Sequence, residues 1–213
     1  AAAALADVGR FMSAADLCWG SAGNISARTG DRSYAITASG TSLGELGPGD
    51  FVECDLAGAR LQGDGKPSKE TPMHQAVYLA RPEVGCVLHA APIHVTTLAC
   101  SNVDLPADWF VEDMYYLERV ARVRYEHPGS QALADAVAER ASDANVLLLE
   151  NHGVLVYDTS IREARLALET LEFSARMVLL ARAAGLGMKP LPAARVTDFL
   201  ERSGYRPRRE WSG

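Results

Sequence analysis

The sequence predicts an α/β or α+β fold around a mostly antiparallel sheet, and three features of the chain point to it. Hydrophobic residues make up 48% and charged residues 23% of the 213 residues, which is typical of a globular domain with a full core. Short apolar runs and longer segments of helical periodicity are mixed along the chain. Two apolar runs are separated by a short turn, as in an antiparallel hairpin. Because there are no internal repeats, we expect one domain over residues 1–213, with 203–213 as a C-terminal tail.

Four segments carry the signals of helices: residues 3–17, 68–81, 130–142 and 160–184. Ser68 is the predicted N-cap of the second helix, because a serine hydroxyl can accept a hydrogen bond from the first turn, and Pro82 lies just past its end. The fourth helix is the longest. It has Glu163 near its start, where the helix dipole favours a carboxylate, and Gly185 at its end.

Five short apolar runs are predicted as strands: residues 34–37, 51–55, 84–89, 146–149 and 154–157. Residues 20–24 form a cluster typical of a turn, and 61–66 are predicted as a turn region. The last two strands flank a turn at 150–153, where Gly153 provides the position at which a positive φ is easiest.

The charge balance and the cysteines limit the functions to be considered. Asp and Glu number 27 against 21 Lys and Arg, for a net charge of −6, so there is no surplus of cations for nucleic acid as the main partner. The four cysteines lack CxxC spacing, and a reducing cytoplasm is expected rather than a disulfide scaffold. The start of the chain lacks the basic region of a secretory signal, and polar residues and a proline in the stretch 84–103 argue against a membrane span.

Two histidines lie at the ends of predicted strands, far apart in the sequence. His89 ends the run 84–89, and His152 lies in the turn before the last strand. Neutral imidazoles at rigid strand ends suit zinc, manganese or iron, although a single histidine is more often a hydrogen-bonded core or turn residue. Glu70 and His74 are four residues apart and share one helix face. Beside metal-bound histidines, Glu70 could ligate the metal or act as an acid or base, whereas alone it is a solvated first-turn glutamate.

Small and hydroxyl residues recur in three segments: residues 20–26, 37–41 and 67–69. Backbone N–H groups in such turns and at helix starts bind phosphate without a large basic patch, and Lys69 adds one point charge. Each segment is also an ordinary turn or cap, so the three together favour a phosphate site only modestly.

Taken in order, five blocks of the chain resemble the class II aldolase/adducin family, which includes fuculose-1-phosphate aldolases and ribulose-5-phosphate 4-epimerases. The blocks are residues 19–28, 36–40, 67–74, 78–89 and 147–154. The resemblance covers most of the chain. It implies an α/β class II aldolase-like three-layer fold, in which helices flank a central mostly antiparallel sheet. It also implies a homotetramer with active sites between subunits.

The resemblance further implies a divalent metal, zinc in the first place, with manganese or iron as alternatives. His89 and His152 correspond to the first and third histidine ligands, and Glu70 to the acidic residue that approaches the metal and moves protons. The second histidine of the family is replaced by Ala91, and His94 matches a further family histidine that is not a ligand. Two histidines and one carboxylate can still hold zinc or non-haem iron.

The remaining site residues also follow from the resemblance. The positions that correspond to phosphate-binding residues are Asn24, Ser39, Gly40 and Ser68. Lys69 stands where relatives often have serine. Tyr115 is the tyrosine expected to act across a subunit boundary, with Tyr116 as the alternative.

The function implied by the resemblance is that of a metal-dependent lyase. It would break a C–C bond of a small phosphorylated sugar or hydroxy acid through an enediolate that the metal stabilises. A repurposed relative acting as a decarboxylase, dehydratase, epimerase or iron-dependent oxygenase is the first alternative, and Ala91 favours it. The second is a non-enzymatic interaction module like the adducin head domain, which would have no need of Glu70, His89 and His152 together.

Overall fold

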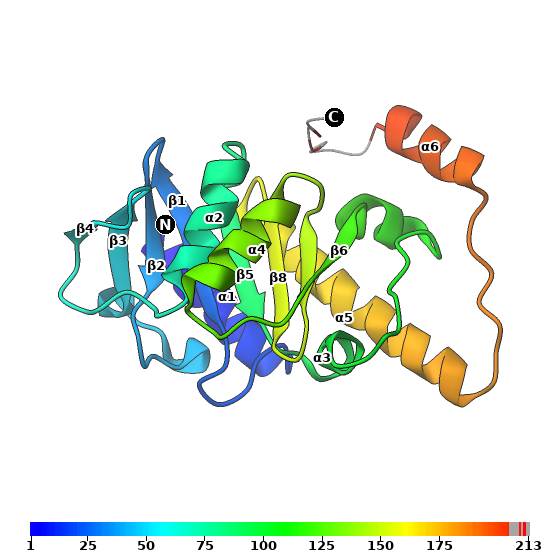
Figure 1. Cartoon of the computed structure of the whole chain (residues 1–213), viewed down its shortest axis with the longest axis horizontal. Helices are drawn as coiled ribbons and strands as arrows, with labels where there is room; N and C mark the ends of the chain where they lie inside the picture. Colours follow the sequence, from blue (N-terminus) through cyan, green and yellow to red (C-terminus); the bar gives the residue numbers. More distant parts are fainter. Residues whose placement is uncertain (205–208, 210, 212–213) are drawn as a thin grey trace.

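A computed structural model of the chain describes residues 1–204, Arg209 and Trp211, and it is organised around one eight-stranded sheet (Figure 1). In chain order the strands are β1 (Asn24–Gly30), β2 (Ser33–Thr37), β3 (Phe51–Asp55), β4 (Arg60–Gln62), β5 (Cys86–Ala90), β6 (Val120–Val123), β7 (Val146–Leu149) and β8 (Gly153–Asp158). Across the sheet they lie in the order β4-β3-β2-β1-β5-β8-β7-β6. All neighbours are antiparallel except β6 and β7, so the predicted mostly antiparallel sheet is confirmed.

Helices cover both faces of the sheet. They are α1 (Ala2–Ala14), α2 (Thr71–Ala80), α3 (Ile93–Ala99), α4 (Gln131–Ala141), α5 (Ile161–Ala183) and α6 (Ala193–Arg202), with the short turns η1 (Leu43–Glu45) and η2 (Pro48–Asp50) and the π-helical turn η3 (Asp113–Leu117). The helices α2 and α4 pack on one face, and α1, α3 and α5 pack on the other (Figure 1). The three-layer α/β architecture is therefore confirmed.

The two cores are separated by the alternation of side chains along the central strands. In β7, Leu147 and Leu149 lie in the core under α2 and α4, whereas Val146 and Leu148 lie in the core under α1, α3 and α5. Because both faces of the central sheet are buried, its strands are continuous apolar runs, and such runs can be predicted as strands from the sequence.

The first two helices differ from the prediction at their ends. The first ends at Ala14, and Asp16 has a left-handed backbone with φ of 56°. The second begins at Thr71 with Glu70 as its N-cap residue, so the prediction of Ser68 as the N-cap was wrong. Ser68 forms the preceding turn instead: its hydroxyl accepts a hydrogen bond from the Glu70 N–H (3.3 Å), and its carbonyl accepts one from the Thr71 hydroxyl (2.6 Å). This turn fixes the backbone on which Glu70 sits.

The strands β1 and β4 were not predicted. In β1 polar residues outnumber apolar ones, and Ser26 can be fully buried because its hydroxyl is hydrogen-bonded to side chains of α2. These hydrogen bonds, which offset the cost of burying a hydroxyl group, are tertiary contacts. Local strand propensity therefore does not predict this strand. The three residues of β4 are all exposed at the sheet edge and replace part of the predicted turn at 61–66.

The tight turn between β7 and β8 holds His152 against the neighbouring strand. Asn151, rather than the glycine, adopts the left-handed conformation, with φ of 54°. Gly153 is required for a different reason, because a Cβ there would lie 2.5 Å from the carbonyl oxygen of Ala90 in β5. The close approach brings the turn beside the end of β5, where His89 lies.

Beyond α5 the chain leaves the sheet (Figure 1). None of the residues of α6 is buried. Of the predicted tail at 203–213, residues 205–208, 210, 212 and 213 lie outside the described part of the chain, whereas Arg209 and Trp211 pack against the body of the domain. Among the described residues, no helix is long and apolar enough to cross a bilayer.

Candidate active site

Glu70, His89 and His152 converge from three separate segments. Glu70 is the N-cap residue of α2, His89 is next to last in β5, and His152 lies in the β7–β8 turn. Glu70 Oε2 lies 3.3 Å from His89 Nε2, and Glu70 Oε1 lies 3.1 Å from His152 Nε2. One ligand atom from each residue falls within 4.8 Å of the others, which makes a candidate metal-binding group.

The hydrogen bonding of His89 favours a cation in this group. Its Nδ1 lies 3.0 Å from the carbonyl oxygen of Val154, and since a carbonyl only accepts, Nδ1 carries the proton. In the neutral ring, Nε2 then presents a lone pair to the Glu70 carboxylate, so two acceptors face each other across 3.3 Å. A metal ion between them removes that repulsion, and a carbonyl holding the outer nitrogen is the usual support of a metal-binding histidine.

The ionisation of the group suits metal binding. Burial alone would raise the pKa of the Glu70 carboxyl, but its contacts with His152, His89 and Asn24 lower the pKa to about 2. For His89, burial dominates and lowers the pKa, against the opposing effect of the Glu70 carboxylate. At neutral pH Glu70 is therefore a carboxylate and His89 a neutral imidazole, the forms that bind a divalent metal.

A buried chain of hydrogen bonds, here called the α2–β1 chain, supports Glu70 from behind. The Asn24 amide donates to Glu70 Oε2 (2.7 Å), and Asn24 Oδ1 accepts from His74 Nε2–H (2.6 Å). His74 Nδ1 accepts from the Ser26 hydroxyl (2.7 Å), whose oxygen accepts from the Tyr78 hydroxyl (2.9 Å). Every donor thus points along the chain toward the ionised Glu70. Burial lowers the pKa of His74 to about 3, which keeps the ring neutral with a single proton to donate.

The spacing of these residues explains the arrangement. Glu70, His74 and Tyr78 are four residues apart along α2 and face one way, while Asn24 and Ser26 are two apart on β1 and face them. The sequence placed Glu70 and His74 on one helix face and assigned His74 a structural role, but it did not reveal the link between them through Asn24. The available signal was the polar stripe at four-residue spacing on an otherwise apolar helix.

A cleft of about 390 Å³ opens next to Glu70. All five residues predicted to bind phosphate line it: Asn24, Ser39, Gly40, Ser68 and Lys69. Two backbone hydrogen bonds tie its walls together, from the Ser39 N–H to the Lys66 carbonyl (2.8 Å) and from the Ser68 N–H to the Thr37 carbonyl (3.0 Å). The lining consists mainly of small side chains, several of which carry hydroxyl groups.

Two further residues near the metal-binding group were singled out by the sequence. Ala91 is buried just beyond β5, and its Cβ lies 3.4 Å from where a Cβ on Gly153 would be, so it faces the turn that carries His152. His94 points elsewhere. Its Nδ1 pairs with Glu172 of α5 at 2.5 Å, so His94 does not take the place of a ligand at Ala91.

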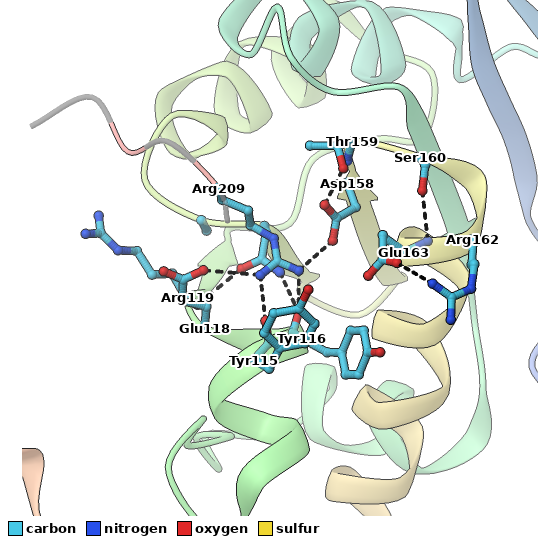
Figure 2. Close-up of polar contacts among 12 residues, drawn as sticks. Tyr115, Tyr116, Glu118, Arg119, Asp158, Thr159, Ser160, Arg162, Glu163 and Arg209 are labelled. Atoms are coloured by element: carbon cyan, nitrogen blue, oxygen red, sulfur yellow. Dashed lines mark hydrogen bonds and ion pairs between the residues drawn. The ribbon is translucent and has the colours of Figure 1, made fainter. Parts of the chain in front are cut away.

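Tyr115 does not join this group within one chain. It lies in η3, beside Asp158 and Glu163, as Figure 2 shows. Asp158 ends β8, whereas Gly153, next to His152, begins it. At about 3.3 Å per residue, the two ends of this strand are roughly 17 Å apart. Burial, followed by the charge of Glu163, raises the pKa of Tyr115 to about 12.

Comparison with known proteins identifies the family to which the chain belongs. The family model of the class II aldolase and adducin N-terminal domain matches residues 3–179. The chain is 35% identical over 163 residues to the 3-oxo-tetronate 4-phosphate decarboxylase of Haemophilus influenzae, covering 74% of this chain and 77% of that protein. It is 33% identical over 161 residues to the L-fuculose phosphate aldolase of Methanocaldococcus jannaschii, covering 76% and 86%.

A solved structure agrees with these sequence matches. The crystal structure of YgbL from Klebsiella pneumoniae superposes with a TM-score of 0.84 at 32% identity, over 91% of this chain and 94% of that one. The chain therefore belongs to the class II aldolase and adducin family. It is an enzyme of the class II aldolase kind.

Proposed function

We propose that this enzyme is a divalent-metal-dependent lyase that breaks a C–C bond next to a carbonyl group in a small phosphorylated sugar or sugar acid. The observation that carries the proposal is the group of Glu70, His89 and His152 beside a cleft walled by small residues and backbone. The group suits a divalent cation and the cleft suits a phosphate, so one substrate could reach both.

Glu70, His89 and His152 would hold the cation. Zinc is our first choice because of the nitrogen and oxygen donor set, and manganese or iron would also be accepted by it. When bound, the cation would stabilise the negative charge that develops on the carbonyl oxygen of the substrate as the neighbouring C–C bond breaks. The neutral state of His89 and the ionised state of Glu70 prepare both residues for this role.

Glu70 would also move the proton. Its carboxylate is held by Asn24 on one oxygen and approached by His152 on the other, so its position is fixed before the substrate binds. In an aldol cleavage the carboxylate accepts the proton of the hydroxyl whose carbon is released as an aldehyde. The same group can then return a proton to the carbon that remains.

The cleft would hold the phosphate. The N–H groups of Ser39 and Ser68 are already bonded to backbone carbonyls, so their hydroxyl groups are the donors that these two residues offer. The backbone N–H of Gly40 and the ammonium of Lys69 add donors without a large basic patch. Asn24 also lines the cleft, but its amide is already hydrogen-bonded to Glu70 and His74. We therefore assign Asn24 first to the support of Glu70 and only second to the phosphate.

Decarboxylation is the second candidate reaction, and the similarity to the decarboxylase of H. influenzae favours it. Loss of CO2 from a phosphorylated 3-oxo acid sends the electron pair of the broken bond to the same kind of carbonyl oxygen, and the carbon then takes up a proton. By their structures, 3-oxo-tetronate 4-phosphate and L-fuculose 1-phosphate would both leave dihydroxyacetone phosphate. One site could thus serve either reaction.

We also propose a homotetramer, in which Tyr115 reaches the site of a neighbouring copy, since Tyr115 lies far from Glu70 in its own chain. Tyr116, whose ring is 4.8 Å from that of Tyr115, is the alternative. The four cysteines are free thiols, which suits the cytoplasmic location that we propose.

The test is turnover of the protein purified without chelator, with its metal content measured by elemental analysis. Both phosphorylated substrates are assayed for dihydroxyacetone phosphate, with CO2 or aldehyde as the second product. Glu70→Gln keeps the size of the side chain and removes its charge. We expect a loss of about 10²–10⁴-fold in turnover, the range for a general acid or base. Glu201→Gln, on the exposed face of α6, is the matched control.

Full activity of Glu70→Gln would contradict the role assigned to this residue. Absence of both products from the wild-type protein carrying its metal would contradict the lyase assignment. Iron as the bound metal, with oxygen consumption and no cleavage without oxygen, would favour the oxygenase alternative.

A further inference from the structure

Arg209 inserts its guanidinium group into the body of the domain at the end of η3. Its side chain is only 4% exposed. As Figure 2 shows, it reaches the carbonyl oxygens of Tyr115 (2.7 Å) and Tyr116 (3.1 Å) and the carboxylates of Glu118 (3.2 Å) and Asp158. A residue 94 positions away from Tyr115 therefore contacts the backbone of both candidate tyrosines.

The end of η3 needs such a partner. The last carbonyl groups of a helix find no N–H donor within the helix. At the end of η3, the carbonyl groups of Tyr115 and Tyr116 accept hydrogen bonds from Arg209 instead. The next residue but one, Glu118, has a positive φ of 33°, a strained conformation for a residue with a side chain. The Asp158 carboxylate is 1% exposed and would be a buried charge without Arg209.

Trp211 makes a second attachment at the same place. Its ring contacts two guanidinium groups, with the centre of the ring 4.6 Å from that of Arg81 and 4.4 Å from that of Arg119. Its indole N–H donates to Glu118 Oε1 at 2.6 Å. Glu118 thus receives Arg209 on one oxygen and Trp211 on the other. The strained residue is held from both sides by the C-terminal segment.

We propose that Arg209 and Trp211 form a C-terminal clasp that fixes the end of η3 and thereby positions Tyr115. The second half of this statement rests on the proposed function. Arg209 is a positioning residue, because it touches the backbone that carries Tyr115. A lysine in its place would be a poor substitute, because one ammonium cannot match the planar fork that reaches two carbonyls and two carboxylates.

The preceding helix α6 also lies against η3, but none of its residues is buried. The buried guanidinium group of Arg209, by contrast, bonds directly to the backbone at the end of η3. We therefore assign the restraint on this end of η3 chiefly to Arg209 and Trp211. Removing them should free η3 while leaving the two cores of the sheet intact, and this makes the proposal testable in the folded protein.

The structural half is tested by hydrogen exchange of the full chain. In the wild type, the Glu118 N–H is bonded to the Asp113 carbonyl (3.2 Å). We expect Arg209→Ala and Trp211→Ala to speed exchange in residues 113–118 by about tenfold or more, and Arg209→Lys to have an intermediate effect. Buried amides of α4, such as that of Val137, serve as the internal control and should not change. Unchanged exchange in residues 113–118 would overturn the clasp.

The functional half is tested by kinetics and a double mutant. We expect Arg209→Ala to lower kcat by about 3- to 100-fold with little change in KM, the range for coupled residues. In a Tyr115→Phe background, the same change should cost no more than about twofold further. Equal losses in both backgrounds, or an unchanged kcat despite faster exchange, would overturn the positioning role. If the wild type cleaves neither substrate, the proposed function fails, while hydrogen exchange still decides on the clasp.

Discussion

Replacing Asp113 with asparagine is expected to change how the stability of the protein depends on pH. Asp113 begins η3, is fully buried, and accepts a hydrogen bond from the Ser174 hydroxyl through Oδ1. Its Oδ2 has no hydrogen-bond partner among the described residues. Burial is the main cause that raises the pKa of Asp113 from 3.8 to about 7, and the charges of Asp108 and Glu112 add to it.

The sign and the size of this pH dependence follow from how tightly Asp113 binds its proton in the folded and in the unfolded state. The folded state binds this proton more tightly than the unfolded state, so the stabilisation is complete below pH 4 and is lost as the pH rises to about 7. At about 1.4 kcal/mol for each tenfold change in proton affinity, the loss is at most about 4 kcal/mol. Asparagine cannot ionise, so Asp113→Asn should lack this loss.

The assay is urea unfolding at pH 5 and pH 8 of the wild type, Asp113→Asn and the exposed control Asp31→Asn. Relative to wild type, Asp113→Asn should gain stability between pH 5 and pH 8, and the control should not. Asparagine leaves a buried N–H without a partner, which costs about 1–3 kcal/mol at both pH values and cancels in the comparison. Equal pH dependence of Asp113→Asn and wild type would refute the reasoning.

Three further outcomes are expected. Ala91→His, which adds an imidazole beside the turn of His152, should tighten divalent metal binding by about 10–100-fold in calorimetric titration, and equal or weaker binding would mean that the site is built around the alanine. His74→Asn breaks a buried hydrogen-bond pair and should lower the free energy of unfolding by about 1–3 kcal/mol, while lowering turnover less than Glu70→Gln; a folded His74→Asn protein as inactive as Glu70→Gln would contradict this order. Light scattering should give about four times the chain mass of 22.8 kDa, and a mass near 23 kDa would exclude the tetramer and any cross-subunit Tyr115.

The parts of the fold that the sequence predicted well are those whose pattern is local. The central strands and long helices are apolar or periodic on their own, and α5 begins within one residue of its predicted start. There the Ser160 hydroxyl accepts a hydrogen bond from the Glu163 N–H (3.2 Å). By contrast, β1 depends on Ser26 finding partners in α2. A buried polar strand is visible only when the groups that satisfy it are known.

The candidate site divides in the same way. His89 and His152 could be selected because they end apolar strands, and Glu70 because it starts a helix. The link from Glu70 through Asn24 to His74 could not be derived, because it requires the register of β1 against α2. Arg209 carries no signal at all in the sequence, since a basic residue near a chain end is ordinarily solvated.

The position of the metal-binding group in the sheet has a consequence for folding. In the strand order, β5 is the junction between a half built from the preceding residues, β4-β3-β2-β1, and a half built from the following ones, β8-β7-β6. Glu70 lies in sequence between those halves, His89 is on the junction strand, and His152 belongs to the second half. A cation bound by all three would cross-link segments 82 residues apart (152 − 70). Such a cation would bind tightly only when both halves of the sheet are folded and joined, so its binding would stabilise the complete fold. Removing it with a chelator should therefore lower the cooperativity with which the two halves unfold.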